Sequence, residues 1–420
     1  MAETSLLNDT ALRRTRQAAA DFAHAFDDLI CGLVRRRSLH LLFEAASPLS
    51  LAVFRPVLEH LKTDTRLEIW YTTADRTWDA ESVFGPGLAS RVLSQRDVRW
   101  TKFDAYVNTD FWNMTWLRRR SRRIHLFHGV AGKYNLDCPV EIAPSVASFD
   151  ELLFPNADRL MRYLDAGLID PRRTKASLVG YPKVDCLVDG TLDRDAIIAA
   201  TNLNPQAPTV LYAPTWSQYS ALHTAGLQML PKLASLGFNV IIKLHDRSFD
   251  ASRDVRGIDW RGRLDVLARN PRIHVVRGAD ISPYLFVSDV VVTDHSSVGF
   301  EFMLLDRPVV VIDCPELIEK ASVNAEKVVL LRSASDVVIP GADIPRVVQT
   351  ALARPDRLGA ERRRVAERLF YQPGGATARA VHCVYDTLGI PAPEPRRQWA
   401  PPASGRVPLD ICEARSASRV

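Results

Sequence analysis

The sequence predicts an α/β protein with two Rossmann-like domains, whose parallel sheets face a cleft, followed by C-terminal helices. Three observations support this prediction. The chain has 420 residues, more than a single compact core usually accommodates. Short apolar runs alternate with longer amphipathic stretches, as expected for parallel strands joined by right-handed helical crossovers. A turn-rich stretch near residues 202–208 separates two halves that each show this alternation.

Each half contains its own series of expected elements. In the first half we expect helices at 48–61 and 157–166, a closing segment at 177–184, and strands at 39–45, 67–71, 105–108, 123–127 and 152–154. In the second half we expect helices at 222–236, 356–370 and 377–388, and strands at 209–212, 239–244, 273–276, 290–293 and 309–313.

The expected domain organisation follows from these elements. It comprises a helical lead-in at 1–37, a first domain at 38–200, a second domain at 201–375, a C-terminal helix at 376–390 and a disordered tail at 391–420. In Rossmann-like sheets, ligands bind beyond the carboxyl ends of the strands. The residues that follow each strand are therefore the first candidates for function.

Composition and charge exclude several classes of protein. Lys+Arg 54 and Asp+Glu 49 give a net charge of +5, which suits anionic ligands but does not call for nucleic acid. The six cysteines form no C-x-x-C pair, which argues against a zinc ribbon or a redox motif. The N-terminal residues do not read as a signal peptide, and no apolar stretch approaches the length of a membrane span. We expect a reduced, cytosolic protein, with attachment to a membrane surface left open.

A histidine follows the expected strand at 123–127. His128 would stand at the carboxyl end of that strand, facing the cleft, and histidine can act as a general base near neutral pH. Gly129 and Gly132 would let a substrate approach the backbone closely. A histidine hydrogen-bonded inside the core, with glycines that serve only the turn, is an equally good interpretation of this segment alone.

Three further strand ends carry polar or aromatic side chains. Thr215 and Trp216 follow the strand at 209–212 and could bind a phosphate and form a wall of the site, although packing alone also explains the tryptophan. Lys243 and His245 should point the same way at the end of the next strand, where two cations would suit a diphosphate. By contrast, 180–185 is best explained as an ordinary loop.

The most specific segment is Val290–Glu301, in which an apolar strand runs through Thr293-Asp294-His295-Ser296-Ser297 into a helix. A serine there can cap the helix, and a helix N-terminus flanked by hydroxyls suits a phosphate. Glu301 lies four residues after Ser297 on the same helix face, where a carboxylate could accept hydrogen bonds from a ribose diol. A plain capped crossover helix explains the serines but not this acidic residue.

Two basic runs remain. Residues 118–123 carry five arginines just before the strand that leads to His128, and could contact a polyanionic acceptor or an anionic bilayer. A solvated basic loop explains them at least as well. The run 362–364 falls on an expected helix and is better explained as a solvated face. Nothing in the sequence matches a P-loop or a kinase.

Taken together, these segments resemble the CDP-glycerol glycerophosphotransferases, the teichoic-acid primases and polymerases of bacterial cell envelopes. The resemblance covers roughly residues 120–310, and its motifs follow the order of the family. The matching residues are His128-Gly129 with Lys133, Gly180-Tyr181-Pro182, Tyr212-Ala213-Pro214-Thr215-Trp216, Lys243-Leu244-His245, Thr293-Asp294-His295-Ser296-Ser297 and Leu304-Leu305-Asp306-Arg307-Pro308.

The resemblance implies a GT-B fold with an acceptor-side first domain, a nucleotide-binding second domain and a C-terminal helix that can cross back. It implies transfer of glycerol phosphate from CDP-glycerol to an acceptor hydroxyl of an envelope glycolipid or polymer, with release of CMP. His128 is then the base. His245, Thr293, Ser296 and Ser297 meet the pyrophosphate, and Glu301 holds the ribose. We expect this transfer to need no metal and no cofactor.

The chain departs from the family pattern at several positions. Val130-Ala131 stands where the family commonly has Thr-Pro, beside the base and on the acceptor side. His295 stands in place of a tyrosine, and Asp246 in place of a proline. The nucleotide side therefore lies closer to the family pattern than the acceptor side does.

Two other interpretations stay open. A nucleotide-sugar glycosyltransferase or a relative of the UDP-sugar 2-epimerases would use the same site for a sugar donor, and would release UDP or a free epimer instead of CMP. A nucleotide-binding scaffold within an envelope assembly complex would bind nucleotides but turn over no donor.

Overall fold

The structure is a computed structural model. It describes Phe26 and residues 38–74, 78–112, 114–132, 139–249 and 257–393. Apart from Phe26 and residues 391–393, the expected lead-in and the expected tail lie outside the described residues. Within the described part of the chain, no helix is long and apolar enough to cross a membrane.

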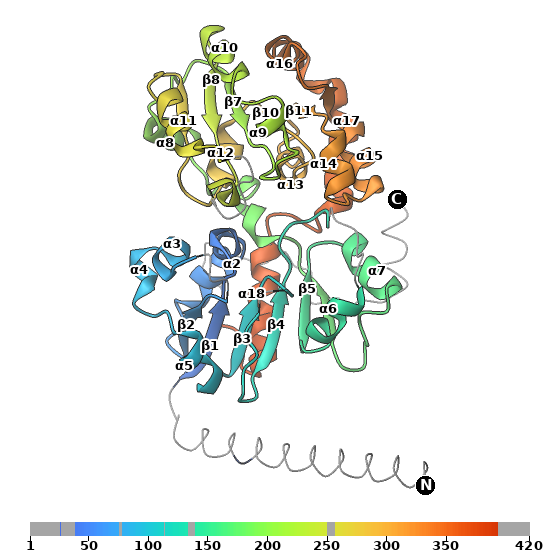
Figure 1. Ribbon diagram of the computed structural model, residues 1–420. Helices are drawn as coiled ribbons and strands as arrows, with labels where there is room; N and C mark the ends of the chain where they lie inside the picture. The colour runs from blue at the N-terminus through green and yellow to red at the C-terminus, as the bar shows by residue number, and fades with distance from the viewer. Residues whose placement is uncertain are drawn as a thin grey trace.

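Two six-stranded parallel sheets form the framework of the molecule, one in each half (Figure 1). The first sheet has the order β2-β1-β3-β4-β5-β6 and the second has the order β12-β11-β10-β7-β8-β9. The strands of the first sheet are β1 (Leu39–Glu44), β2 (Leu67–Thr72), β3 (Ala105–Asn108), β4 (Arg122–Leu126), β5 (Glu151–Phe154) and β6 (Lys175–Leu178). Those of the second are β7 (Thr209–Tyr212), β8 (Asn239–Ile242), β9 (Ile273–Val275), β10 (Val290–Thr293), β11 (Val309–Ile312) and β12 (Asp336–Val338).

Helices cover the sheets and connect their strands. In the first half they are α2 (Pro48–Leu61), α3 (Ala80–Phe84), α4 (Pro86–Ala89), α5 (Gln95–Trp100), α6 (Pro139–Val146), α7 (Ala157–Asp165) and the 3₁₀ segment η1 (Pro182–Leu187). The chain continues with α8 (Arg194–Thr201), α9 (Ala221–Thr224), α10 (Met229–Ser235), η2 (Asp246–Phe249), α11 (Trp260–Leu267), α12 (Ser282–Val287), α13 (Ser297–Met303), α14 (Pro315–Lys320), α15 (Ala325–Ser333), α16 (Ile344–Ala353), η3 (Pro355–Leu358), α17 (Gly359–Leu369) and α18 (Ala376–Leu388).

The α/β fold class predicted from the sequence is confirmed, with both sheets parallel throughout. The valine runs of β10 and β11 are buried on both faces, as strands in the middle of a parallel sheet should be. Strands β3, β7 and β10 have the predicted bounds.

Three predicted elements are wrong in detail. The helix expected at 356–370 is η3 followed by α17. The single helix expected at 222–236 is divided into α9 and α10, because the chain turns at Gly226, whose φ is +67°. The segment expected at 177–184 begins in β6 but then turns at Gly180 and enters η1. The φ of Gly180 is +88°, and a Cβ there would lie 2.5 Å from the carbonyl oxygen of Tyr371.

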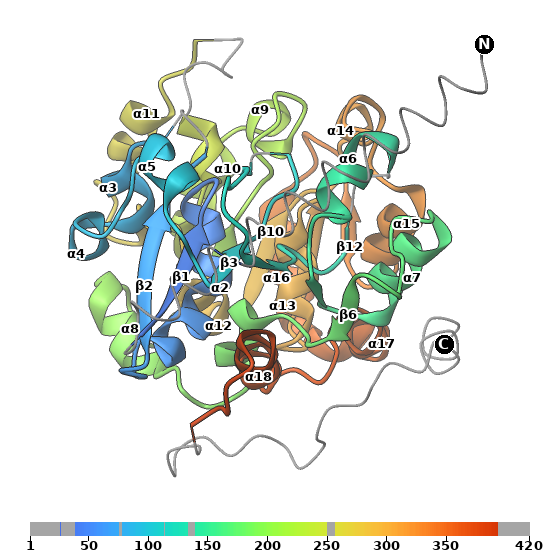
Figure 2. The ribbon, with the colours of Figure 1, turned by 90° about the horizontal axis from the view of Figure 1, so that it is seen from below.

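Helix α18, the last described helix, lies against the first sheet rather than the second (Figure 1 and Figure 2). Asp185 in η1 accepts hydrogen bonds from the N–H groups of Gly374 and Thr377 at its start, at 2.8 and 2.6 Å. Near its end, Tyr385 donates to Asp64, which follows α2, at 2.8 Å. The chain therefore passes between the two halves a second time before α18.

Helix α8 packs on α12, and Arg194 donates to the carbonyl oxygen of Val287 at 2.6 Å. We therefore propose a domain boundary between η1 and α8, somewhat before the expected position at residue 200. With this boundary, the first domain comprises residues 38–187 with α18, and the second domain comprises α8 to α17.

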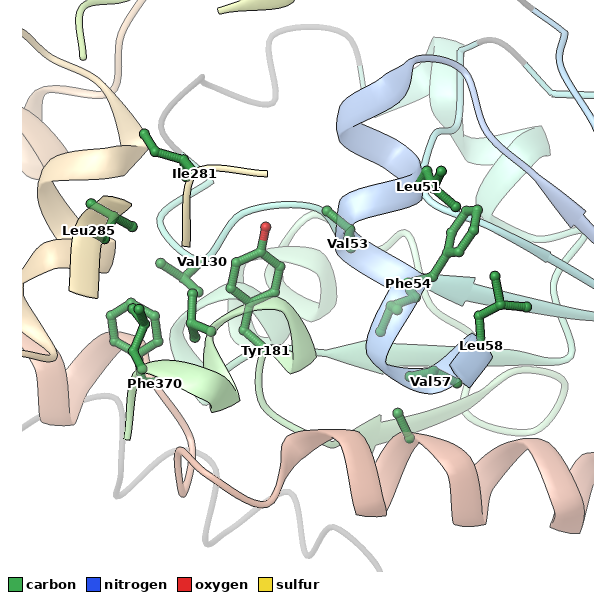
Figure 3. Close-up of a cluster of buried hydrophobic side chains, with 14 of the residues drawn as sticks. Leu51, Val53, Phe54, Val57, Leu58, Val130, Tyr181, Ile281, Leu285 and Phe370 are labelled. Atoms are coloured by element: carbon green, nitrogen blue, oxygen red, sulfur yellow. The ribbon is translucent and has the colours of Figure 1, made fainter. Parts of the chain in front are cut away.

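One buried hydrophobic cluster connects the domains (Figure 3). Phe54 and Val57 come from α2 of the first domain, and Ile281 and Leu285 come from the region of α12 in the second. Tyr181, at the start of η1, lies between these groups in Figure 3. The domains therefore share apolar surface in addition to the two chain connections.

Candidate active site

His128 stands just beyond β4, where the sequence placed it, with its side chain exposed. Its Nδ1 lies 2.6 Å from the carbonyl oxygen of Thr109, which follows β3. A carbonyl oxygen can only accept, so Nδ1 must carry the hydrogen of this bond. In the neutral ring, Nε2 then has the lone pair that a general base needs.

The surroundings of His128 favour its neutral form. Loss of hydration among the surrounding protein atoms lowers the pKa of His128 below the usual histidine value, although the ring still reaches solvent. The guanidinium groups of Arg159 and Arg247 act in the same direction, whereas Asp110 raises the pKa. The ring is therefore neutral, and able to accept a proton, at neutral pH.

A different histidine fills the role of a core residue in this region. His125 is buried in β4, its ring stacks on Phe111 with centroids 3.8 Å apart, and its Nδ1 lies 2.8 Å from Asn108 Oδ1. Burial holds the pKa of His125 well below the usual value. The histidine packed in the core here is thus His125, whereas His128 is exposed, so the interpretation of His128 as a core histidine is wrong.

The loop after β4 faces the second domain. Gly129 has a φ of +73°, and a Cβ on it would lie 3.9 Å from Ser297 Oγ at the start of α13. The carboxyl ends of β4 and β10, one from each sheet, therefore meet at this point. Lys133, the other residue predicted in this loop, lies outside the described residues.

Thr293 and Asp294 position the backbone around the site from buried positions. Thr293 donates to the carbonyl oxygen of Ala213 at 2.6 Å. Asp294 is fully buried, and its carboxylate accepts from the N–H groups of Thr215 and Ala221 at 3.0 Å. The Thr215 hydroxyl is itself buried, and no hydrogen-bond partner for it occurs within the described ranges. Asp294 thus fixes the strand-end loop that carries Thr215.

Ser296 is the N-cap of α13 and accepts from the N–H of Val298 at 3.5 Å, as predicted for one of the two serines. The next helical residue is Ser297, which faces Gly129 across the domains. His295, between Asp294 and the cap, is buried and has its Nε2 3.0 Å from Asp313 Oδ1. This histidine therefore pairs with the partly exposed Asp313 and joins the ends of β10 and β11.

Lys243 and His245 follow β8, but their environments differ. Lys243 is buried, and its ammonium group donates to the carbonyl oxygen of Leu244 at 2.7 Å and to Asp246 at 3.0 Å. Asp246, the residue that replaces the family's proline, thus neutralises a lysine that would be costly to bury alone. The expectation that both side chains offer cations to a diphosphate needs correction: Lys243 is already paired.

His245 is half-buried, and its Nδ1 accepts the N–H of Arg247 at 3.1 Å. In the neutral ring the hydrogen is then on Nε2, which makes this nitrogen a donor. The His245 ring lies near Trp216, with centroids 6.5 Å apart, and the Arg247 guanidinium lies 5.7 Å from the Trp216 ring centre. His128 and His245 therefore have opposite hydrogen-bonding character, one as an acceptor and one as a donor.

Glu301 has a partner that the sequence did not reveal. Its Oε2 accepts from Lys183 Nζ at 2.7 Å, and both side chains are nearly fully buried. Opposite charge at Glu301 raises the pKa of Lys183, which burial alone would lower. Because Lys183 comes from η1 of the first domain, this ion pair connects the domains beside α13. The interpretation of residues 180–185 as an ordinary loop is wrong.

Sequence reasoning also missed the residues that hold the His128 loop. Arg159 on α7 donates to the carbonyl oxygens of His128 and Gly129, and Arg162 donates to that of Gly132. Both arginines lie on α7, the helix that follows β5, so a search of the residues after each strand could have found them. No three His, Cys, Asp or Glu side chains among the described residues gather where they could bind a metal ion.

The chain also matches known proteins in sequence and in fold. Residues 104–317 match the family model described as CDP-glycerol:poly(glycerophosphate) glycerophosphotransferase. A teichoic acid poly(glycerol phosphate) polymerase from Staphylococcus epidermidis is 28% identical over 171 residues. That match covers 38% of this chain and only 22% of the relative's length.

Solved structures show the same fold. A variant of the wall teichoic acid polymerase TagF superposes with a TM-score of 0.61 at 14% identity, covering 88% of this chain and 97% of the other. The complex of MnaA from S. aureus with UDP gives a TM-score of 0.55 at 12% identity, covering 85% and 99% of the two chains. The matched family model includes strands of both sheets and every described strand-end residue discussed above. The chain belongs to the CDP-glycerol:poly(glycerophosphate) glycerophosphotransferase family.

Proposed function

We propose that the protein transfers glycerol phosphate from CDP-glycerol to an acceptor hydroxyl during the synthesis of a cell-envelope polymer, and releases CMP. The observation that carries this proposal is His128, a neutral histidine with its Nε2 lone pair available, in a loop that faces the serine-flanked start of α13. Family membership supports the donor and the type of acceptor. A glycolipid or a growing polymer would supply the acceptor hydroxyl.

In the proposed reaction, the oxygen of the acceptor hydroxyl attacks the β-phosphorus of CDP-glycerol, and His128 Nε2 takes the proton of that hydroxyl. The bond from that phosphorus to the bridging oxygen breaks, and CMP leaves with the electron pair. Most of the rate would come from positioning and from stabilising charge on the phosphates. His245 Nε2–H is well suited to donate to a phosphate oxygen.

The other candidate residues either contact the donor or support the site in this proposal. Ser296, Ser297 and Thr215 would contact the phosphates, and Glu301, which pairs with Lys183, would hold the ribose. The remaining candidates support the site: Gly129 would give the acceptor room, and Thr293, Asp294 and Lys243 fix the surrounding backbone. Lys133 stays a predicted substrate-binding residue on the evidence of the sequence.

Calorimetric titration of the full chain with CDP-glycerol, CDP, UDP and UDP-N-acetylglucosamine tests the donor. We expect CDP and CDP-glycerol to bind at least about tenfold more tightly than the uridine compounds, a difference of about 1.4 kcal/mol. Preference for UDP would contradict the proposal and favour a sugar donor. Binding of CDP-glycerol without CMP release, in the presence of an acceptor, would favour a scaffold.

We also propose that the protein works in the cytoplasm and attaches peripherally to the inner face of the membrane. Trp100, Trp112 and Trp116 are exposed by 65%, 64% and 53%. The basic run at 118–123 adjoins them, because Arg118 Cζ lies 5.7 Å from the Trp100 ring centre. Indole rings suit the membrane interface, and arginines attract anionic headgroups.

Sedimentation with vesicles tests this attachment. We expect the protein to bind phosphatidylcholine vesicles that contain phosphatidylglycerol, to bind pure phosphatidylcholine far less, and to lose binding in high salt. Replacing both Trp112 and Trp116 by serine should reduce binding about tenfold or more. The matched control replaces the exposed Arg172 and Arg173 by glutamine and should bind normally. Equal binding by both variants would rule out this surface.

A further inference from the structure

Helix α7 carries polar residues that contact two different parts of the molecule. It begins after β5, and Asn156 caps it by accepting the N–H of Arg159 at 2.8 Å. Arg159 turns toward the loop of His128, whereas Asp158 turns toward the second domain. Figure 2 shows α7 on the same side of the molecule as α15 and α17. The first turn of α7 therefore lies between the loop that holds the base and the second domain.

Arg159 hydrogen-bonds the backbone of the His128 loop. One of its terminal nitrogens donates to the carbonyl oxygens of both His128 and Gly129, at 3.1 and 2.6 Å. Its guanidinium group also lies over the Phe127 ring, 4.5 Å from the ring centre. Two successive carbonyl groups that bond one nitrogen must point toward it together, which fixes both peptide planes. Fixed peptide planes determine the direction in which the His128 side chain leaves the backbone.

The ring of His128 is fixed separately, by the bond from Nδ1 to Thr109. The backbone contact and the ring contact together leave little freedom to the Nε2 atom. Without these contacts the backbone at Gly129, which has a positive φ here, could adopt other conformations, because glycine has few steric restrictions. Placement of a reacting group matters because an error of about 1 Å can cost about 10²-fold in rate.

We infer that Arg159 is a positioning residue that holds the His128 base in its reactive orientation, and that α7 sets this orientation relative to the second domain. The inference rests on the proposed function, in which His128 is the base. Asp158 bonds Lys327 on α15 and Arg368 on α17, each at 2.6 Å. Asn156 Nδ2 donates to the carbonyl oxygens of Val130 and Leu369 at 2.9 and 2.7 Å, so a single side chain connects the base loop to the end of α17.

The test compares Arg159→Met and Arg159→Lys with the wild type in the full chain. We expect Arg159→Met to lower kcat about 10²-fold, while the Kd for CDP changes by less than about threefold. Arg159→Lys keeps a donor and a positive charge, so its kcat should lie between the two. The matched control is Arg172→Met, an exposed arginine outside the site, which should behave as wild type.

A pH profile separates positioning from a general loss of structure. The Arg159 charge lowers the pKa of His128, so its removal should move the acid limb of kcat/KM to higher pH. The lysine variant should show a smaller movement. A merely structural role would lower the amount of active enzyme without moving this limb. If Arg159→Met proves unfolded by circular dichroism, the lysine variant carries the test.

The outcomes distinguish this inference from the proposed function. Wild-type kcat and an unmoved acid limb in Arg159→Met, together with an inactive His128→Ala, would overturn the inference and leave the proposed base intact. Retained turnover in His128→Ala would remove the base itself, and the role of Arg159 with it. A loss of CDP affinity that equals the loss of kcat would also overturn the inference, because it would place Arg159 in nucleotide binding.

Discussion

Replacing His128 by alanine is expected to lower turnover of CDP-glycerol by about 10²–10⁴-fold, the usual contribution of a general base. Binding of CDP should change little, because the His128 side chain bonds Thr109 of the first domain rather than the strand-end loops of the second. The measurement is CMP release at saturating donor, with calorimetry of CDP binding on the same preparation. His382→Ala, which removes an exposed histidine on α18, is the matched control and should retain full activity.

The pH dependence of the wild type provides an independent check. A base must be unprotonated, and the pKa of His128 is lowered by its surroundings. We therefore expect kcat/KM to rise with pH up to an apparent pKa below about 6.5, the ordinary histidine value, and then to level off. Substantial turnover in His128→Ala that keeps this same acid limb would show that another group is the base.

Breaking the ion pair between the domains should have the largest effect on stability. Lys183→Met leaves Glu301 as a buried carboxylate without its cation, and such changes cost about 3–5 kcal/mol. Urea denaturation of the full chain measures the loss. Lys62→Met is the matched control, because its pair with Glu59 is exposed and should contribute no more than about 1 kcal/mol.

A double variant strengthens this test. Replacing Lys183 by methionine and Glu301 by leucine removes both charges, so much of the lost stability should return. The double variant should bind CDP more weakly than the wild type does, because the proposed ribose contact is absent. A loss of less than about 1 kcal/mol in Lys183→Met would mean that water reaches Glu301 and that the pair does not connect the domains strongly.

The strands were predictable from the sequence because strands in the middle of parallel sheets leave a local signature. The valine runs at 290–292 and 309–311 belong to strands that are buried on both faces. Strand β12 escaped prediction, since it has three residues and begins with Asp336 at the sheet edge. The helix at 222–236 was predicted as continuous because its apolar spacing hides the turn at Gly226.

The location of the candidate site was predictable for a similar reason. His128, Thr215 and Ser296 each follow an apolar strand, and the geometry of parallel sheets brings such positions together. Their partners were not predictable in this way. The contact between Lys183 and Glu301 joins residues 118 positions apart, and no local pattern encodes it. The same holds for Arg159, whose role depends on a loop that lies 30 positions earlier.

The return of α18 to the first domain has a consequence for how the chain folds as it is made. The second domain, α8 to α17, is continuous in sequence, so it can complete its core without waiting for later residues. The first domain cannot complete its core in this way, because α2 packs against α18 and Asp185 bonds the start of α18. A chain truncated just after α17 would therefore have a second domain close to its final form and a first domain with uncovered apolar surface. Such a fragment should bind chaperones through its N-terminal part.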